Sequence, residues 1–376
     1  MFTLPPISLY IHIPWCLKKC GYCDFYSYVS KEIIPENKYI EHLLRDFERD
    51  LSLINNRNIN TIFIGGGTPS LLKNTSIKNL LNGIKKRKII SKNIEISIEA
   101  NPKTLEYQNF IQYKNSGINR FSLGIQTFNS KMLKKIERTY NSKDAMNAII
   151  ESKKISDNIN LDLMYGLPGQ SLEEALSDLQ IAIQCNPSHI SWYQLTIEPN
   201  TVFYAKKIQT PHQDVVFNML IEGDKLLKKA GYKKYEISSY SKFNYQCQHN
   251  LNYWNFGDYI GIGCGSHGKI TQKNGEIIRT IKNKNINDFL SGKYINSVYQ
   301  VSKRDKIFEY FMNVFRLYKP IFKKHFRENT NIEESFIEKN IQIAIQEGFL
   351  INQSDCWHTT KKGKNFLNSL LEIFLK

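Results

Sequence analysis

The sequence predicts an α/β fold: a partial (β/α)6 barrel of the TIM type, followed by a smaller, mixed and mainly helical C-terminal region. Three observations lead to this prediction. Strand and helix patterns alternate through about the first 200 of the 376 residues. Polar and apolar side chains alternate along the strands, and the later sequence becomes glycine-rich and then helical. A chain of this length can bury a large core and form one large domain with one or two smaller ones.

Six segments are predicted as strands, and six segments between or after them as helices. The strands are 8–13, 60–66, 94–100, 119–126, 159–165 and 189–195. The helices are 36–54, 75–87, 104–116, 129–137, 142–154 and 171–185. This alternation is typical of a parallel sheet built from βα units. Six units are fewer than a closed barrel of eight requires, so the sequence predicts a partial barrel or an open sheet.

The strand patterns favour the partial barrel. In a sheet covered on both faces, strands usually read as continuous apolar runs. Here Glu95, Ser97 and Glu99 share one face, while Ile96 and Ile98 share the other. The same alternation puts Tyr10, Gln126 and Asp162 on the polar faces of their strands. Because a polar lumen is costly unless it holds water or a ligand, we expect a wide, incompletely closed barrel with its site inside.

The loop after the first strand carries Cys16, Cys20 and Cys23 in a C-x3-C-x2-C spacing. An iron–sulfur cubane held by protein alone takes four cysteines. Three cysteines would therefore leave one iron with an open position, as catalytic metals have. The alternatives are free thiols or a zinc site, which usually shows a further ligand pair along the chain. His12 could be a fourth ligand, but its place on the preceding strand favours a packing or orienting role.

A glycine loop, Gly65-Gly-Gly-Thr-Pro69, ends the second strand at the same edge of the sheet. Glycines let a backbone approach a ligand closely, and ligands bind at this edge in such folds. Glu99-Ala-Asn-Pro102 ends the third strand there, with loop hydrogen bonding as the plain alternative. Gly166-Leu-Pro-Gly169 ends the fifth strand and is interpreted first as a turn.

Beyond residue 200 the pattern predicts a helix at 213–230 and a strand at 232–238. The next segment is rich in aromatic residues and glycine: Cys247-Gln-His249-Asn-Leu-Asn-Tyr253-Trp254 and Asp258-Tyr-Ile-Gly-Ile-Gly-Cys264-Gly-Ser-His267-Gly. It either contacts a ligand or forms a strand pair with a buried, hydrogen-bonded histidine.

Helices are expected at 303–318, 333–347 and 361–374, with a small hairpin between the last two. This tail resembles a winged helix with a structural or partner-docking role. The predicted domains are 1–230 for the barrel, 231–300 for accessory strands closing the site, and 301–376 for the helical tail.

The composition narrows the class of protein. The net charge is +16, but the excess lysines are scattered, and no nucleic-acid-binding motif accompanies them, so we expect no nucleic-acid partner. A carboxylate-bearing small ligand is favoured by this charge.

Residues 1–7 show no signal peptide, and no apolar run is long enough to span a membrane. Seven cysteines, an odd number, suit a reducing cytoplasm better than a set of disulfides.

The cysteine spacing, Tyr22 just before the last cysteine, and the glycine loop together resemble the radical S-adenosylmethionine (SAM) superfamily. Further motifs resemble the oxygen-independent coproporphyrinogen III oxidase-like family within it. They are Tyr10-Ile-His-Ile-Pro, Glu99-Ala-Asn-Pro, Gly124-Ile-Gln-Thr-Phe and Asp162-Leu-Met-Tyr-Gly-Leu-Pro. The similarity covers almost the whole chain, including the helical tail. It implies a partial barrel of the radical SAM type.

The resemblance also implies cofactors. Cys16, Cys20 and Cys23 would bind three irons of a [4Fe–4S] cluster, and SAM would chelate the fourth. An electron from the cluster would then cleave SAM to methionine and a deoxyadenosyl radical, so an electron donor is expected. By motif position, the SAM-binding residues are Tyr10, Tyr22, Gly66, Gly67, Thr68, Glu99, Gln126, Arg138 and Asp162. Arg138 suits the carboxylate of SAM, and Glu99 and Asp162 suit its hydroxyls or cationic end.

One departure selects the branch of this family. The oxidases carry a further cysteine two residues after the third, where this chain has Phe25. The segment His249-Asn-Leu-Asn-Tyr253-Trp254 instead resembles the H-N-x-x-Y-W signature of a haem-chaperone branch. That resemblance implies haem binding and transfer to an acceptor protein. His249 would be the haem ligand and Tyr253 and Trp254 would pack on the macrocycle, with His267 and Cys264 as rival ligands.

Two enzymatic functions remain as alternatives. The first is an oxygen-independent coproporphyrinogen III oxidase, since the SAM motifs are complete, although Phe25 argues against it. The second is radical SAM chemistry on an unrelated substrate. The sequence leaves the haem acceptor unnamed and is compatible with a homodimer.

Overall fold

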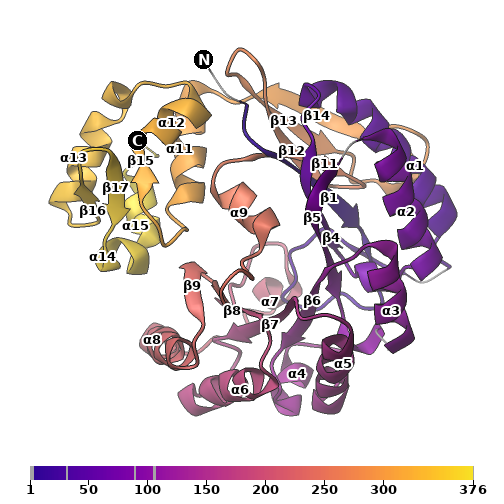
Figure 1. Ribbon diagram of the computed structural model, residues 1–376. Helices are drawn as coiled ribbons and strands as arrows, with labels where there is room; N and C mark the ends of the chain where they lie inside the picture. Colours follow the sequence, from indigo (N-terminus) through magenta and orange to yellow (C-terminus); the bar gives the residue numbers. More distant parts are fainter. Residues whose placement is uncertain (1–3, 31–32, 89, 105–106, 376) are drawn as a thin grey trace.

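Parallel strands form the centre of the sheet on which the structure is built (Figure 1). The computed structural model describes residues 4–30, 33–88, 90–104 and 107–375. The central strands, in spatial order, are β1 (Ile7–Ile13), β4 (Ile59–Gly66), β5 (Ile90–Ala100), β6 (Arg120–Gln126), β7 (Ile159–Tyr165) and β8 (His189–Gln194). All neighbours in this group pair in parallel. The predicted partial (β/α)6 barrel is therefore confirmed.

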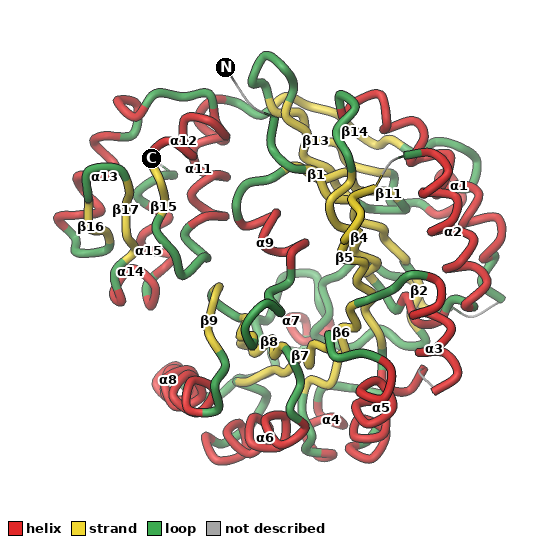
Figure 2. The backbone as a smooth tube through the Cα atoms, in the orientation of Figure 1, coloured by secondary structure: helices red, strands yellow, loops and turns green. Residues whose placement is uncertain are grey.

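Helices cover the outer, convex face of this curved sheet, as Figure 2 shows. They are α1 (Glu36–Asp50), α2 (Asn74–Arg87), α3 (Tyr107–Ser116), α4 (Ser130–Lys135), α5 (Ser142–Ile155) and α6 (Leu172–Cys185). Capping boxes begin α5 and α6, where Asn141 and Ser171 each bond reciprocally with an acidic residue three positions on. The helix predicted from 104 begins later, because Pro102–Thr104 forms a 3-10 turn. Its positions 105–106 lie outside the described residues.

Further strands extend both edges of the sheet. On the β1 side, β11 (Asp258–Ile262) pairs in parallel, followed by the antiparallel strands β12 (His267–Thr271), β13 (Ile277–Lys282) and β14 (Ile295–Gln300). On the β8 side lie β10 (Ser239–Ser241) and β9 (Lys233–Glu236). In the described part of the chain this makes one sheet of 12 strands, with β14 and β9 at its edges. Outside this sheet, β2 (Trp15–Cys16) and β3 (Tyr28–Val29) form a separate parallel pair. The remaining helices of this part are α7 (Val202–Ala205), α8 (Gln213–Lys229) and α10 (Ile286–Phe289).

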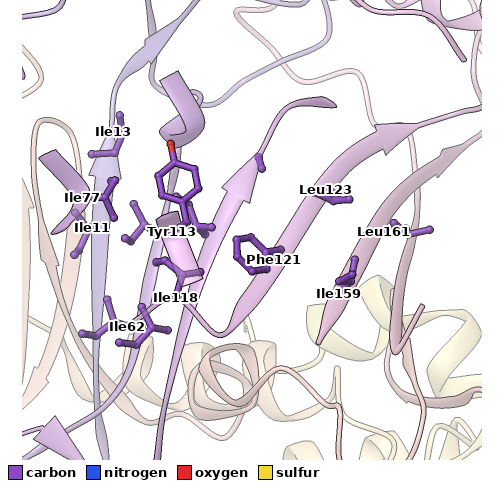
Figure 3. Packing of buried hydrophobic residues seen from close by; sticks show 14 of the residues in the cluster. Ile11, Ile13, Ile62, Ile77, Tyr113, Ile118, Phe121, Leu123, Ile159 and Leu161 are labelled. Carbon is purple, nitrogen blue, oxygen red and sulfur yellow. The ribbon is translucent and has the colours of Figure 1, made fainter. Parts of the chain in front are cut away.

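The main apolar core lies between the sheet and its outer helices. Figure 3 shows Ile11, Ile62, Phe121 and Leu161, from strands β1, β4, β6 and β7 respectively, together with Tyr113 of α3. All five are essentially inaccessible to solvent. Burying one large apolar side chain contributes about 1.5–3 kcal/mol, so this layer supplies much of the stability. The opposite faces of the same strands carry the polar residues, as the alternation predicted.

The C-terminal region has an apolar core of its own, centred on Phe311, Phe326 and Trp357. It contains α11 (Lys303–Val314), α12 (Lys323–Thr330), α13 (Glu338–Gln346), α14 (Lys361–Asn365), α15 (Leu367–Glu372) and the small sheet β15 (Ile321–Phe322), β17 (Cys356–Thr359) and β16 (Leu350–Asn352). The hairpin expected before the last helix is β16–β17. The region joins the barrel edge where Leu317 forms a β-bridge with Glu236 of β9. The division into three domains stays a prediction.

Helix α9 (Gln248–Trp254) corrects part of one expectation: these residues form a helix, whereas the expected strand pair is β11–β12, further along the chain. It lies inside the arc of the sheet, on the side of the polar faces (Figure 1). Its N-cap residue, Cys247, gives no side-chain cap. Instead the carboxylate of Glu95, in the middle of β5, accepts the backbone N–H groups of Gln248 and His249, both at 3.0 Å. The helix is thus attached to the sheet by a residue distant in sequence.

No helix within the described ranges has both the length and the apolar character needed to cross a bilayer.

We predict that Glu95→Ala lowers the free energy of unfolding by about 1–2 kcal/mol, because two N-terminal N–H groups of α9 lose their acceptor. Urea denaturation measures this change. Glu41→Ala is the control, since Glu41 forms an exposed ion pair with Arg45 on α1, and its loss should change stability by less than about 0.5 kcal/mol. Equal effects of the two substitutions would contradict the capping role of Glu95.

Candidate cofactor site in the barrel lumen

A cavity of about 290 Å³ opens at the carboxyl ends of the central strands. All the cysteines of the first loop and most of the predicted SAM-binding residues line it: Cys16, Cys20, Tyr22, Cys23, Gly66, Gly67, Thr68, Glu99, Gln126, Arg138 and Asp162. These residues come from distant parts of the sequence, and the sheet brings them together because parallel strands end at one edge. Among the other lining residues are Phe25, Asn101, Thr104, Ser122, Thr139 and Tyr193. Among these, Ser122 lies on the same polar strand face as Gln126, so the alternation in the sequence indicates its place in the lumen.

The three cysteines of the loop are free thiols, as are the other four of the chain. Polar groups of the barrel point at two of them. The Thr68 hydroxyl lies 3.5 Å from Cys16 Sγ, and Arg138 Nη1 lies 3.5 Å from Cys20 Sγ. Such donors suit thiolates, which are the form that binds iron. In the part of the chain that is described, no three His, Cys, Asp or Glu side chains form a group that could hold a single metal ion.

The glycine loop is fastened to the cysteine loop by its backbone. Gly67 N–H donates to Ile13 O and Thr68 N–H to Trp15 O, both at 2.7 Å. A Cβ atom on Gly67 would lie 2.6 Å from Trp15 O, so no larger residue fits. Gly66 has φ +112°, and a Cβ there would lie 2.6 Å from the His12 ring. The glycines are therefore required by close packing and backbone conformation at the rim of the cavity.

His12 packs beneath this loop, as its place on the strand predicted. Its Nε2 donates to Tyr26 O at 2.8 Å, so its Nδ1 is the acceptor for the Tyr10 hydroxyl at 3.0 Å. With both nitrogens engaged, His12 has no lone pair left for a metal. Tyr10, predicted to contact SAM, is not among the cavity-lining residues. Its ring stacks on Phe63, with centroids 6.4 Å apart.

Two carboxylates and one guanidinium give the cavity its charge pattern. Desolvation in the lumen, reinforced by repulsion from Asp162, raises the pKa of Glu99 to about 8. Desolvation also raises the pKa of Asp162, although hydrogen bonds from Ser122 and Asn160 oppose this shift. Arg138 is held at the same cavity by Gly124 O at 3.0 Å. A ligand with both cationic and carboxylate groups would complement this arrangement.

The predicted haem residues lie elsewhere. His249 of α9 is buried, with Nδ1 2.9 Å from the Thr61 hydroxyl and its ring centroid 5.1 Å from that of Phe63. Burial lowers its pKa to about 3. Phe63, between the rings of Tyr10 and His249, separates α9 from the cavity. Tyr253 and Trp254 are half-buried at the far end of the same helix.

The rival ligands differ in exposure. His267 is exposed at the start of β12, whereas Cys264 is buried with its Sγ 2.9 Å from Lys284 O.

A partial barrel with three cysteines and a glycine loop at one rim defines a radical SAM protein. The Radical SAM superfamily model matches residues 10–182, and the HemN C-terminal domain model matches residues 301–366. Among solved structures, coproporphyrinogen III oxidase (HemN) from Escherichia coli has a TM-score of 0.84 at 19% identity, covering 99% of this chain and 90% of that one. This likeness shows the fold.

Curated relatives define the family more closely. "Heme chaperone HemW" of Buchnera aphidicola subsp. Schizaphis graminum is 68% identical, with 100% of both chains covered. "Heme chaperone HemW" of Escherichia coli K12 is 48% identical, again over 100% of both chains. The chain belongs to the HemW family of radical SAM proteins. Membership of the superfamily implies a [4Fe–4S] cluster and SAM, and the thiols and charges at the cavity fit both groups.

We predict that Glu99→Gln stabilises the cofactor-free protein increasingly as the pH rises. The folded-state pKa of Glu99, about 8, lies above its ordinary value of 4.5. The protonated carboxyl therefore favours folding below pH 4.5, and this contribution is lost as the pH rises to about 8. Glutamine avoids the loss. Between pH 5.5 and 8.5 the advantage of the variant should grow by about 2–3 kcal/mol in urea denaturation.

The matched control is Glu222→Gln, because Glu222 forms an exposed ion pair on α8. Its stability difference from the wild type should stay constant over the same pH range. A constant difference for Glu99→Gln as well would contradict the raised pKa.

Proposed function

We propose that this protein binds haem and transfers it to an acceptor protein, using a radical SAM scaffold that carries a [4Fe–4S] cluster and SAM. The observation that carries the proposal is the identity of 48–68% over the full chain to proteins named heme chaperone HemW. Phe25 adds support. It lines the mouth of the cavity and is 58% exposed, at the position where the resemblance to the oxidases implies a cysteine.

At the cofactor site, Cys16, Cys20 and Cys23 would hold the cluster. When bound, the cluster and SAM together supply one-electron chemistry. Arg138 would bind the SAM carboxylate through its fork of N–H donors. Glu99 and Asp162 would hold the cationic part, and the bound cation would keep both ionised at neutral pH.

The other predicted residues would shape the SAM pocket. Gly66, Gly67 and Thr68 would form its backbone wall, with Tyr22 and Gln126 at its side. Tyr10 lies outside the lining and its hydroxyl donates to His12 Nδ1, so we propose that it supports the glycine loop from beneath.

For haem, we propose contact with Tyr253 and Trp254 of α9 and ligation by His249. Two cations flank this helix: the Arg316 guanidinium lies 4.2 Å from the Trp254 ring centroid, and Lys319 Nζ bonds to Asn255 Oδ1. They could pair with the haem propionates. His249 could reach iron only if its hydrogen bond to Thr61 opened, because the ring is buried. The exposed His267 is the rival ligand.

The electron donor would dock beside the cysteine loop, where Leu17, Lys18 and Lys19 are exposed. A cationic and apolar rim of this kind suits an acidic electron carrier. We place the protein in the cytoplasm, since none of its seven cysteines forms a disulfide, which suits a reducing compartment. A homodimer is compatible with this proposal.

The second candidate function is oxygen-independent oxidation of coproporphyrinogen III. The observation that favours it is the complete set of polar residues around the cavity, which a carrier that never uses SAM would not need.

A haemin titration tests the main proposal. The wild type, with its cluster reconstituted under anaerobic conditions, should give a saturable Soret change at one haem per chain. His249→Ala should weaken binding at least about tenfold, because the ligand is lost. His267→Ala, the matched control, should bind as the wild type does. The opposite result would make His267 the ligand, and no saturable binding by the wild type would refute the proposed function.

The oxidase alternative predicts a product. In an anaerobic assay with SAM, dithionite and coproporphyrinogen III, we expect no protoporphyrinogen IX above the level of a Cys16→Ala control, because Phe25 replaces the cysteine implied by the oxidase resemblance. Formation of protoporphyrinogen together with SAM cleavage would replace the haem-transfer proposal. SAM cleavage without porphyrin turnover would indicate another substrate.

A further inference from the structure

A chain of hydrogen bonds runs through the lumen from the cofactor cavity to helix α9. It begins at Asp162, which lines the cavity. The Ser122 hydroxyl donates to Asp162 Oδ2 at 2.8 Å, and Asn160 Nδ2 donates to Asp162 Oδ1 at 2.7 Å. Asn160 Nδ2 also donates to Ser122 Oγ at 2.8 Å. Two neighbouring side chains thus fix the orientation of the Asp162 carboxylate.

The path of hydrogen bonds continues through His189 and Tyr235 to the N-cap residue of the helix. His189 Nδ1 donates to Asn160 Oδ1 at 2.6 Å. His189 Nε2 is then the acceptor for the Tyr235 hydroxyl at 2.8 Å. The same hydroxyl oxygen accepts the backbone N–H of Cys247, the N-cap of α9, at 3.2 Å. One protonation state of His189, with the proton on Nδ1, satisfies all these hydrogen bonds together.

Burial restricts the movement of the side chains in this series of hydrogen bonds. His189 is 0% exposed, Asn160 1% and Tyr235 5%. Burial also lowers the pKa of His189 well below its usual value, so the ring is neutral. In such surroundings no water competes for the hydrogen bonds. If one bond breaks, the buried donor and acceptor lose their partners, which raises the free energy of the folded state. The chain therefore favours two states, intact or broken, over intermediate ones.

Other groups outside the cavity lining also attach α9. Glu95 accepts two N–H groups at the start of the helix, and Thr61 bonds to His249. Neither Glu95 nor Thr61 lines the cavity. The bond between Tyr235 and Cys247 is thus the attachment that leads back to Asp162 through hydrogen bonds. The buried Arg120 guanidinium, which interacts electrostatically with Asp162, Tyr235 and Glu95, lies beside this path.

We propose that His189 is a positioning residue that couples the cavity to helix α9: a cationic ligand held by Asp162 stabilises the seated helix, and the seated helix holds Asp162 in its binding orientation. The coupling is reciprocal, as any coupling between two binding equilibria must be. It does not depend on haem. If the proposed function holds as well, SAM in the cavity keeps His249 buried, and loss of SAM releases it.

Hydrogen exchange of residues 247–255 in the cluster-reconstituted protein, with and without SAM and without reductant, tests the coupling. SAM should slow the exchange of this segment at least about fivefold in the wild type. Tyr235→Phe removes one hydroxyl from the chain, so the SAM effect should disappear. The control is Tyr113→Phe, because Tyr113 is also buried and its hydroxyl bonds to Leu72 O, outside this path of hydrogen bonds. This variant should keep the SAM effect.

Equal protection by SAM in the wild type and in Tyr235→Phe would overturn the inference, as would no protection in the wild type. Should Tyr235→Phe not fold, His189→Phe breaks the same chain and is read in the same way. The reciprocal measurement is SAM affinity by equilibrium dialysis: Glu95→Ala, which loosens α9 away from the cavity, should weaken SAM binding at least about fivefold. Unchanged affinity would also overturn it. None of these measurements contains haem, so failure of the haem proposal would not affect them.

Discussion

The structure depends on how charge is accommodated inside the sheet. Six strands turn their apolar faces to the outer helices, so their polar faces must share a lumen. A buried polar group is costly unless it is paired. At one end of the lumen, α9 and the groups around it supply partners, as Glu95 does for the helix N-terminus and Asn160 for His189. At the other end Glu99 keeps a raised pKa, and it is there that a charged ligand would be stabilised.

The sequence predicts the features of this arrangement that depend on local patterns, such as residue alternation and cysteine spacing. Alternation along 95–99 identified the lumen face of β5, and the spacing of Cys16, Cys20 and Cys23 identified the rim. Because parallel strands end together, residues as distant as Thr68 and Arg138 could be assigned to one site from the order of strands and motifs along the chain. The same reasoning placed Tyr10 in the lining. Its side chain lies outside the cavity lining, because alternation gives the face of a strand but not the depth of a side chain in the lumen, and its contact with SAM stays a prediction.

What sequence could not predict was set by contacts between distant residues. Residues 247–254 lack a capping side chain of their own and form a helix on acceptors from Glu95, more than 150 residues earlier. The strands of 258–300 are held by buried ion pairs: Lys269 meets Asp258, and Lys282 meets Asp46 and Asp50 of α1. The sequence shows these lysines only as part of a large positive charge. His249 was a chemically sound ligand by residue type, but its burial depends on Thr61 and Phe63.

The β-bridge between Leu317 and Glu236 has a mechanical consequence. The sheet of the described residues is open, and its edge strands β14 and β9 do not pair with each other. The two edges can therefore move apart without breaking hydrogen bonds between strands. One of these edges, β9, is tied to the C-terminal region by that bridge and by Tyr318 N–H, which donates to Tyr235 O at 2.9 Å. The C-terminal region is therefore bonded directly to the backbone of β9. A displacement of this region would act on the backbone of Tyr235, and through it on the lumen, from outside the barrel.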